Sequence, residues 1–137
     1  MSINSGQAYH QNMVHYLRAE VGFADDGSTL SLGWVPPESA IIRGGVVVVT
    51  AFDSGTSDVL DIGFRNAGDG TTLDADEYAT DLDLTTAGVI SADEMATAAD
   101  AYLPEGAEIT CAYTSAGTAP TAGVGYVWVE YIVNNDE

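Results

Sequence analysis

The chain has 137 residues, of which three are lysine or arginine and 21 are aspartate or glutamate, so its net charge is −18 with neutral histidines. A domain of this length buries about two-thirds of the surface of its unfolded chain, and 46% hydrophobic residues are too many for a disordered acidic tail. The charge argues against nucleic-acid binding and against docking on anionic lipid, since both require a basic surface. The single cysteine excludes an internal disulfide and a thiolate zinc cluster.

The acidic composition also predicts the salt concentration in which the protein works. The three basic residues are all arginines, Arg18, Arg43 and Arg65. Excess carboxylates repel one another, and concentrated salt screens that repulsion, because the Debye length is about 3 Å at 1 M. We therefore expect a halophilic or marine source, the alternative being an ordinary acidic protein with a positively charged partner. Residues 51–110 carry 14 of the acids and one arginine, so we expect this segment to face solvent and the two ends to supply core or contact surface.

Residues 1–12 are predicted to form an N-terminal arm that contacts the partner or a neighbouring copy, 13–133 a single domain, and 134–137 a tail. Apolar residues alternate with mostly polar ones over 13–23 and again over 30–34, which is typical of half-buried strands. The sequence Ala24-Asp25-Asp26-Gly27 between them has turn chemistry. Residues 13–35 are therefore predicted to form a hairpin, which ends at Pro36-Pro37 because proline cannot donate a ladder hydrogen bond.

Four further segments have the β-branched composition of strands. Ile41–Phe52 is predicted to be a strand buried on both faces, with a bend or bulge at Gly44-Gly45. Val59–Phe64, Glu108–Thr114 and Gly125–Val133 are predicted to be shorter strands.

Residues 65–106 are the least regular part of the sequence. We expect a loop over 66–72, a short strand over 77–84, and one or two helical turns over 92–102. In total, seven or eight short strands predict an all-β fold, an antiparallel β-sandwich of jelly-roll type.

The sequence gives little support for a metal site. The two histidines, His10 and His15, are five residues apart and would face opposite sides of one strand. The acids of 74–83 (Asp74, Asp76, Glu77, Asp81 and Asp83) suit either a cation site or a solvated acidic loop, and we favour the loop because the calcium-loop pattern is missing. We predict no metal site and no cofactor.

The sequence gives equally little support for a catalytic site. A serine triad would need one of the two histidines, and the sequence contains neither a nucleophile elbow nor a phosphate-binding loop. Cys111 lies among apolar neighbours and is predicted to be a buried, inert thiol. Asp53, Asp58 and Asp61 flank a turn and are predicted to cap it. We therefore expect that the protein is not an enzyme.

Aromatic residues suggest a contact surface. Trp34, Tyr126, Trp128 and Tyr131 form either a ligand platform, for example for a sugar, or core and cross-strand pairs. The last predicted strand, Gly125–Val133, is apolar on both faces, so one face must be covered by an arm of the same chain or by a neighbouring subunit. This pattern predicts a homo-oligomer.

Three motifs carry a resemblance to a known family. Trp34–Ile42 resembles the proline–alanine–isoleucine start of a strand in small virion proteins of tailed viruses. Val46–Gly63 is similar to that family's valine-rich strand, "AFNSGTSD" turn and "LDVG" strand, with Asp53 where asparagine is usual. The stretches 116–123 and 127–131 resemble its closing "SGTAPTAG…VEY" hairpin, so the resemblance covers under half of the chain.

The resemblance is to capsid decoration (cement) proteins. It implies a compact β-sandwich or jelly roll that binds the exterior of a virus head, contacts the major capsid protein and forms a trimer. It implies a virion location after assembly in the host cytoplasm, and it supplies no catalytic residue. A head turret, fibre or tail component is the near alternative, and a carbohydrate-binding sandwich on the virion is a third.

Overall fold

A computed structural model describes residues 13–66 and 71–134. Nine strands and one short 3-10 turn make up its regular structure. The strands are β1 (His15–Gly22), β2 (Thr29–Val35), β3 (Ser39–Thr50), β4 (Ser57–Arg65), β5 (Thr72–Asp83), β6 (Gly88–Ser91), β7 (Tyr102–Leu103), β8 (Ala107–Ala116) and β9 (Val124–Val133), and the turn is η1 (Phe23–Asp25). No helix among the described residues is long and apolar enough to cross a membrane.

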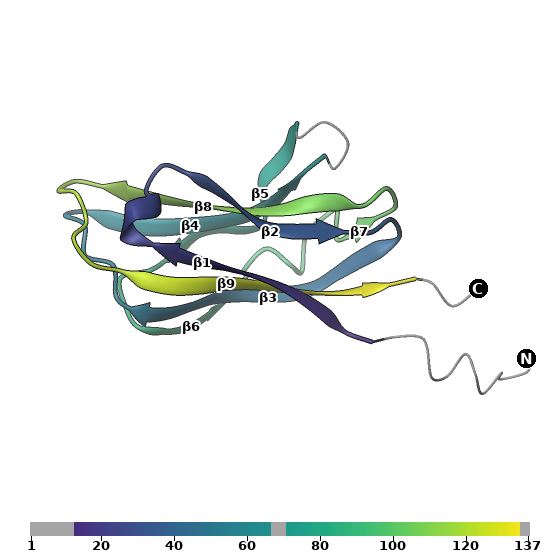
Figure 1. Ribbon diagram of the computed structural model, residues 1–137, viewed down its shortest axis with the longest axis horizontal. Helices are drawn as coiled ribbons and strands as arrows, with labels where there is room; N and C mark the ends of the chain where they lie inside the picture. The colour runs from purple at the N-terminus through teal and green to yellow at the C-terminus, as the bar shows by residue number, and fades with distance from the viewer. Residues whose placement is uncertain (1–12, 67–70, 135–137) are drawn as a thin grey trace, which may run out of the picture.

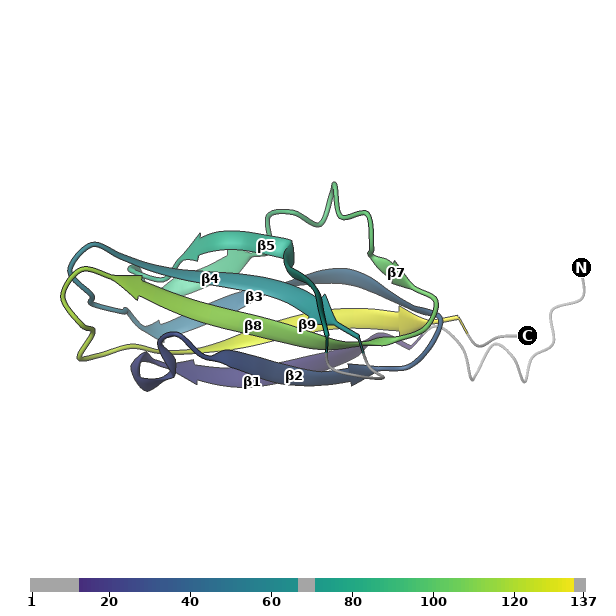
Figure 2. The ribbon, with the colours of Figure 1, turned by 90° about the horizontal axis from the view of Figure 1, so that it is seen from above.

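The strands form two antiparallel sheets that pack face to face (Figure 1). Sheet A has the order β1-β9-β3-β6, with the short β7 also paired to β3. Sheet B has the order β2-β8-β4-β5 and lies over sheet A in the view of Figure 2. These two orders are those of a jelly roll, in which most connections pass from one sheet to the other. The predicted β-sandwich of jelly-roll type is confirmed, with nine strands because 65–106 contains the short β6 and β7.

The predicted hairpin over 13–35 is wrong. Its two strands exist, but β1 pairs with β9 in sheet A and β2 pairs with β8 in sheet B. The chain crosses between the sheets through η1, where the Phe23 amide donates to the Gly123 carbonyl and the Gly27 amide to the Tyr113 carbonyl. Alternation fixes which side chains of a strand point inward. Trp34 follows the register shift between Ser31 and Gly33 and is exposed, but Leu17 and Val21 of β1 and Leu30 and Leu32 of β2 do point into one core. They do so from opposite layers.

Of the bend or bulge predicted at Gly44-Gly45, the bulge is not present. The register of β3 shifts between Ile41 and Arg43 and between Val48 and Thr50, and it is continuous at the two glycines. A Cβ on Gly45 would lie 2.2 Å from the Ile90 carbonyl oxygen, so glycine here permits the close approach of β6.

The helical turns predicted over 92–102 do not form. This segment consists of bends and non-helical turns. Ala92, Met95 and Ala98 are partly buried and pack against the core. Their three-residue spacing resembles a helical period, but successive turns place them on the sandwich instead.

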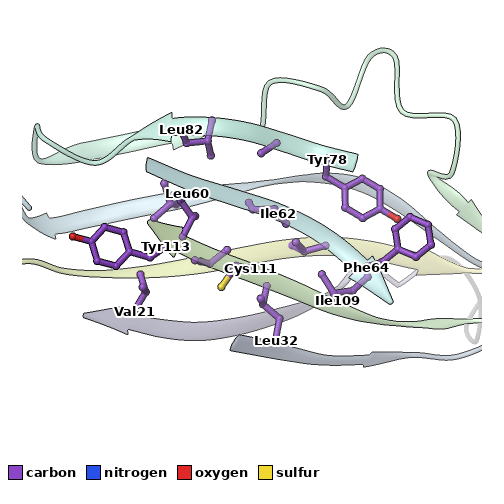
Figure 3. Packing of buried hydrophobic residues seen from close by; sticks show 14 of the residues in the cluster. Val21, Leu32, Leu60, Ile62, Phe64, Tyr78, Leu82, Ile109, Cys111 and Tyr113 are labelled. Carbon is purple, nitrogen blue, oxygen red and sulfur yellow. The ribbon is translucent and has the colours of Figure 1, made fainter. Parts of the chain in front are cut away.

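The core lies between the sheets (Figure 3). Leu60, Ile62, Ile109 and Val127 are fully buried within it. Among the described residues, eleven of the 21 buried hydrophobic ones come from 51–110, so the expectation that this acidic segment mainly faces solvent is wrong for its strands. Its acids lie between apolar positions that alternate inward.

Candidate functional site

The outer face of sheet A displays aromatic side chains in adjacent rows. Val21 of β1 and Val127 and Val129 of β9 are buried in the core, so the residues that alternate with them point outward. The antiparallel register sets Arg18 opposite Trp128. On the other side of β9, its pairing with β3 sets Tyr126 opposite Val47. Residues from both ends of the chain therefore meet on one surface.

These outward side chains form a shallow groove of about 480 Å³, which we call the aromatic groove. It is lined by Tyr16, Arg18, Val47, Val89, Tyr126, Trp128 and Glu130. Tyr16 is 68% exposed and Val89 is 69% exposed at its margins. Large apolar side chains that gather in a groove, rather than being scattered, indicate an interaction surface.

The electrostatics of the groove are unusual for this chain. The Arg18 guanidinium carbon lies 4.4 Å from the centre of the Tyr126 ring, a cation–π contact. Beside it, Arg43 Nε donates to Glu130 Oε2 at 2.6 Å. Among the described residues Arg18 makes no ion pair within 4.0 Å. The groove therefore holds a cation whose charge is set against an aromatic ring rather than a carboxylate.

Charge is divided between the two sheets. The strands of sheet A contain two arginines and two glutamates, Arg18, Arg43, Glu20 and Glu130, for a net charge of zero. The strands of sheet B contain eight acids and one arginine, for a net charge of −7. The aromatic groove thus lies on the neutral sheet of a strongly acidic molecule.

Acidic side chains of sheet B accept hydrogen bonds from other groups of the protein. Asp61 Oδ1 accepts from the Asp81 amide at 2.7 Å, and Asp83 accepts from the amide and hydroxyl of Thr85. The Thr85 hydrogen bonds lower the pKa of Asp83, whereas a hydrogen bond with Asp74 raises the pKa of Asp76. In the part of the chain that the structure describes, no group of three or more acids, histidines or cysteines is arranged to hold a metal ion.

Two carboxylates are buried and paired. Asp58 is 1% exposed and accepts from the Tyr113 hydroxyl at 2.5 Å and the Ser54 amide at 2.9 Å. Burial, and then the Asp58 carboxylate, raise the pKa of Tyr113. Arg65 Nε donates to Glu108 Oε1, and this hydrogen bond lowers the pKa of Glu108. Both pairs lie within sheet B, where they join β4 to β8.

The aspartates beside the turn after β3 accept hydrogen bonds from backbone amides. Asp53 accepts from the amide and hydroxyl of Thr121 and from the Ala122 amide, and these bonds, led by that from the Thr121 hydroxyl, lower the pKa of Asp53. This ties the turn after β3 to the loop before β9. Asp58 accepts from the Ser54 amide and so caps the turn as predicted. Asp61 accepts from the Asp81 amide of β5, so the predicted capping is wrong for Asp53 and Asp61, which bind distant segments instead.

The four aromatic residues singled out in the sequence do not form one platform. Trp128 and Tyr126 line the aromatic groove. Trp34 lies on β2 opposite Glu108, in sheet B, and is 54% exposed. Tyr131 packs partly against the core and stacks on His15, with ring centres 5.3 Å apart.

Sequence reasoning missed Tyr16, Arg18 and Val89 as surface partners of Trp128. The alternation over 13–23 already places Tyr16 and Arg18 on the face opposite Leu17 and Val21. What the sequence did not contain was the pairing of β1 with β9. Only that pairing brings the two rows together.

The remaining candidate residues have structural surroundings. His15 stacks on Tyr131, as an ordinary strand residue does, and His10 lies outside the described residues. Cys111 is a free, buried thiol. Burial raises the pKa of Cys111 to about 12, which keeps the thiol protonated and unreactive at neutral pH.

Comparison with known proteins finds the same fold in three phage capsids. A chain in the acidic stable capsid structure of Helicobacter pylori bacteriophage KHP30 is 14% identical, with a TM-score of 0.64 over 91% of both chains. A chain in the capsid of Ralstonia phage GP4 is 15% identical, with a TM-score of 0.63 over 91% of this chain and 87% of that one. A chain in the capsid asymmetric unit of cyanophage Pam1 is 12% identical, with a TM-score of 0.60 over 90% and 87%.

At these identities the likeness concerns the fold, which is one found in phage capsids. No protein-family model and no curated sequence matches the chain.

Proposed function

We propose that this chain is a virion structural protein that decorates and stabilises the outer surface of a tailed-virus head. The observation that carries the proposal is the fold, which nearly all of this chain shares with chains of three phage capsid structures. The motifs at 34–63 and 116–131 support the same class of protein. Its partners are the major capsid protein and further copies of itself, with a trimer as the proposed oligomer.

The uneven charge supports an orientation on the particle. Sheet B and the loops of 65–106 carry most of the acids, so they face solvent, where water and salt screen them. The neutral sheet A lies toward protein contacts. In this orientation the protein stabilises the head by binding alone and needs no catalytic residue, in keeping with a protein that is not an enzyme.

Cryo-electron microscopy of the virion tests this function directly. Density that fits the nine-stranded sandwich on the outside of the head is the expected result. Density at a vertex turret, a fibre or the tail would replace decoration with one of those roles. Absence of the chain from purified virions would refute the whole proposal.

A carbohydrate-binding role is the second candidate, and the aromatic groove favours it. Open grooves lined by tyrosine and tryptophan suit the apolar faces of sugar rings. A glycan array separates the two functions, because sugar binding that is lost in Trp128→Ala would support this candidate.

A further inference from the structure

We infer that the aromatic groove of one copy is the docking site for residues 1–12 of a neighbouring copy of this chain. The inference deepens the self-association included in the proposed function and does not depend on attachment to a capsid. Its starting point is that the groove exposes large apolar side chains on the neutral sheet of a molecule of charge −18.

The absence of charged side chains in residues 1–12 favours this segment as the occupant of the aromatic groove. Residues 1–12, MSINSGQAYHQN, contain no aspartate, glutamate, lysine or arginine, whereas the rest of the chain contains all 21 acids. An uncharged segment enters a neutral groove without the repulsion that two acidic surfaces would meet. Ile3 and Tyr9 supply apolar groups for the groove, and the amide and hydroxyl side chains supply hydrogen-bond partners for Arg18 and Glu130.

The position of the segment fits this role. It ends at Asn12; the next residue, Met13, leads into β1, and β1 contributes Tyr16 and Arg18 to the groove. Twelve extended residues span up to about 40 Å, enough to reach from one sandwich to the next. To enter its own groove, the segment would have to reverse direction close to Met13, because Tyr16 and Arg18 lie just after that point on β1. Docking on a neighbour needs no such reversal.

An exchanged segment also lets two acidic copies associate with little contact between their bodies. A stable interface usually buries about 800 Å² on each partner. A segment of twelve residues adds contact area while it leaves the acidic bodies of the two copies apart. Because a groove and a segment are different surfaces, copies associate either by reciprocal exchange in a dimer or head to tail in a closed ring such as a trimer.

The test is the molar mass of the full chain by size-exclusion chromatography with light scattering, at tens of micromolar protein in 1 M NaCl. We expect the unaltered chain to have a multiple of 14.2 kDa. Tyr16→Glu and Val89→Glu alter the groove, Tyr9→Asp alters the segment, and all three should give 14.2 kDa.

Trp34→Glu is the matched control. Trp34 is an exposed aromatic residue on the edge strand of sheet B, as Tyr16 is on the edge strand of sheet A, and the charge change is the same. This variant should keep the mass of the unaltered chain, and circular dichroism melts should show that every variant is folded. A monomeric unaltered chain overturns the inference. So does dissociation by the groove variants with Tyr9→Asp unchanged, or dissociation by Trp34→Glu as well. Virion binding, measured separately, decides the proposed function.

Discussion

Replacing Tyr113 by phenylalanine should destabilise the protein more than any other loss of a single hydroxyl. The Tyr113 hydroxyl donates to Asp58, and both residues are 1% exposed. The variant leaves a buried carboxylate with the Ser54 amide as its remaining hydrogen-bond donor. A hydrogen bond to a charged group contributes about 1.5–3 kcal/mol. The packing of the ring against Phe52, 4.8 Å between centres, is retained in phenylalanine.

That free energy corresponds to a measurable shift in melting temperature. The average unfolding entropy per residue makes 1 kcal/mol worth about 3–4 °C in a domain of this size. Tyr113→Phe should therefore lower Tm by about 5–10 °C in circular dichroism melts at pH 7 and 1 M NaCl.

Tyr78→Phe is the matched control for this prediction. Tyr78 is also 1% exposed, but its hydroxyl donates to the backbone carbonyl of Asp100 at 2.9 Å. Loss of a neutral hydrogen bond costs about 0.5–1.5 kcal/mol, so the expected shift is about 2–5 °C. Adding Asp58→Asn to Tyr113→Phe should recover part of the loss, because a buried amide costs less than a buried carboxylate. Equal shifts for the two tyrosine variants, or no recovery with asparagine, would refute the reasoning.

Four other predictions follow from the charges and from the thiol. Lowering NaCl from molar to millimolar should lower Tm and loosen the oligomer, with KCl equally effective, because screening weakens repulsion among 21 acids; a flat salt series would contradict this and the halophilic source. Arg65→Gln should lower Tm by several degrees because Glu108 is nearly buried, whereas Arg43→Gln, at an exposed pair, should change Tm by less than about 2 °C; equal shifts would count against it. Cys111 should react with Ellman's reagent only after denaturation, and fast labelling of the native protein would show that the thiol is accessible. The hydrogen bonds led by that from the Thr121 hydroxyl lower the pKa of Asp53 in the folded state, so they stabilise the protein at neutral pH and are lost as the pH falls through that lowered pKa; Asp53→Asn should flatten the stability curve in acid, and an unchanged acid limb would exclude this contribution.

The sequence predicted strands better than it predicted their partners. Ile41–Phe52 and Gly125–Val133 became β3 and β9 almost at the expected bounds, because a run of β-branched residues has few other stable conformations. Period-two alternation assigns a side chain to the core or to solvent but contains no information about which strand lies beside it. That is why β1 and β2 were joined into a hairpin.

The same limit explains the candidate site. The aromatic outer row of β9 was visible in the sequence, and the structure places Tyr126 and Trp128 of this row in the aromatic groove. Its extent depended on the neighbours of β9, which are β1 on one side and β3 on the other. Trp34 was grouped with Trp128 by residue type alone, and the fold places them in different sheets. The position of β6 beyond β3 brought Val89 to the groove, and nothing in the local sequence around Val89 indicates this.

The division of charge follows from the topology. Along the sequence, the acids are concentrated in 51–110, and the jelly roll sends the two long strands of that segment, β4 and β5, to sheet B. Sheet A is built mainly from β1, β3 and β9, which come from the two ends of the chain. Six of the seven residues that line the aromatic groove therefore come from the two ends, with Val89 as the exception. The expectation that the ends supply contact surface is thus consistent with the fold, since a chain that concentrates its acids in the middle can keep one sheet neutral only if that sheet is assembled from its ends.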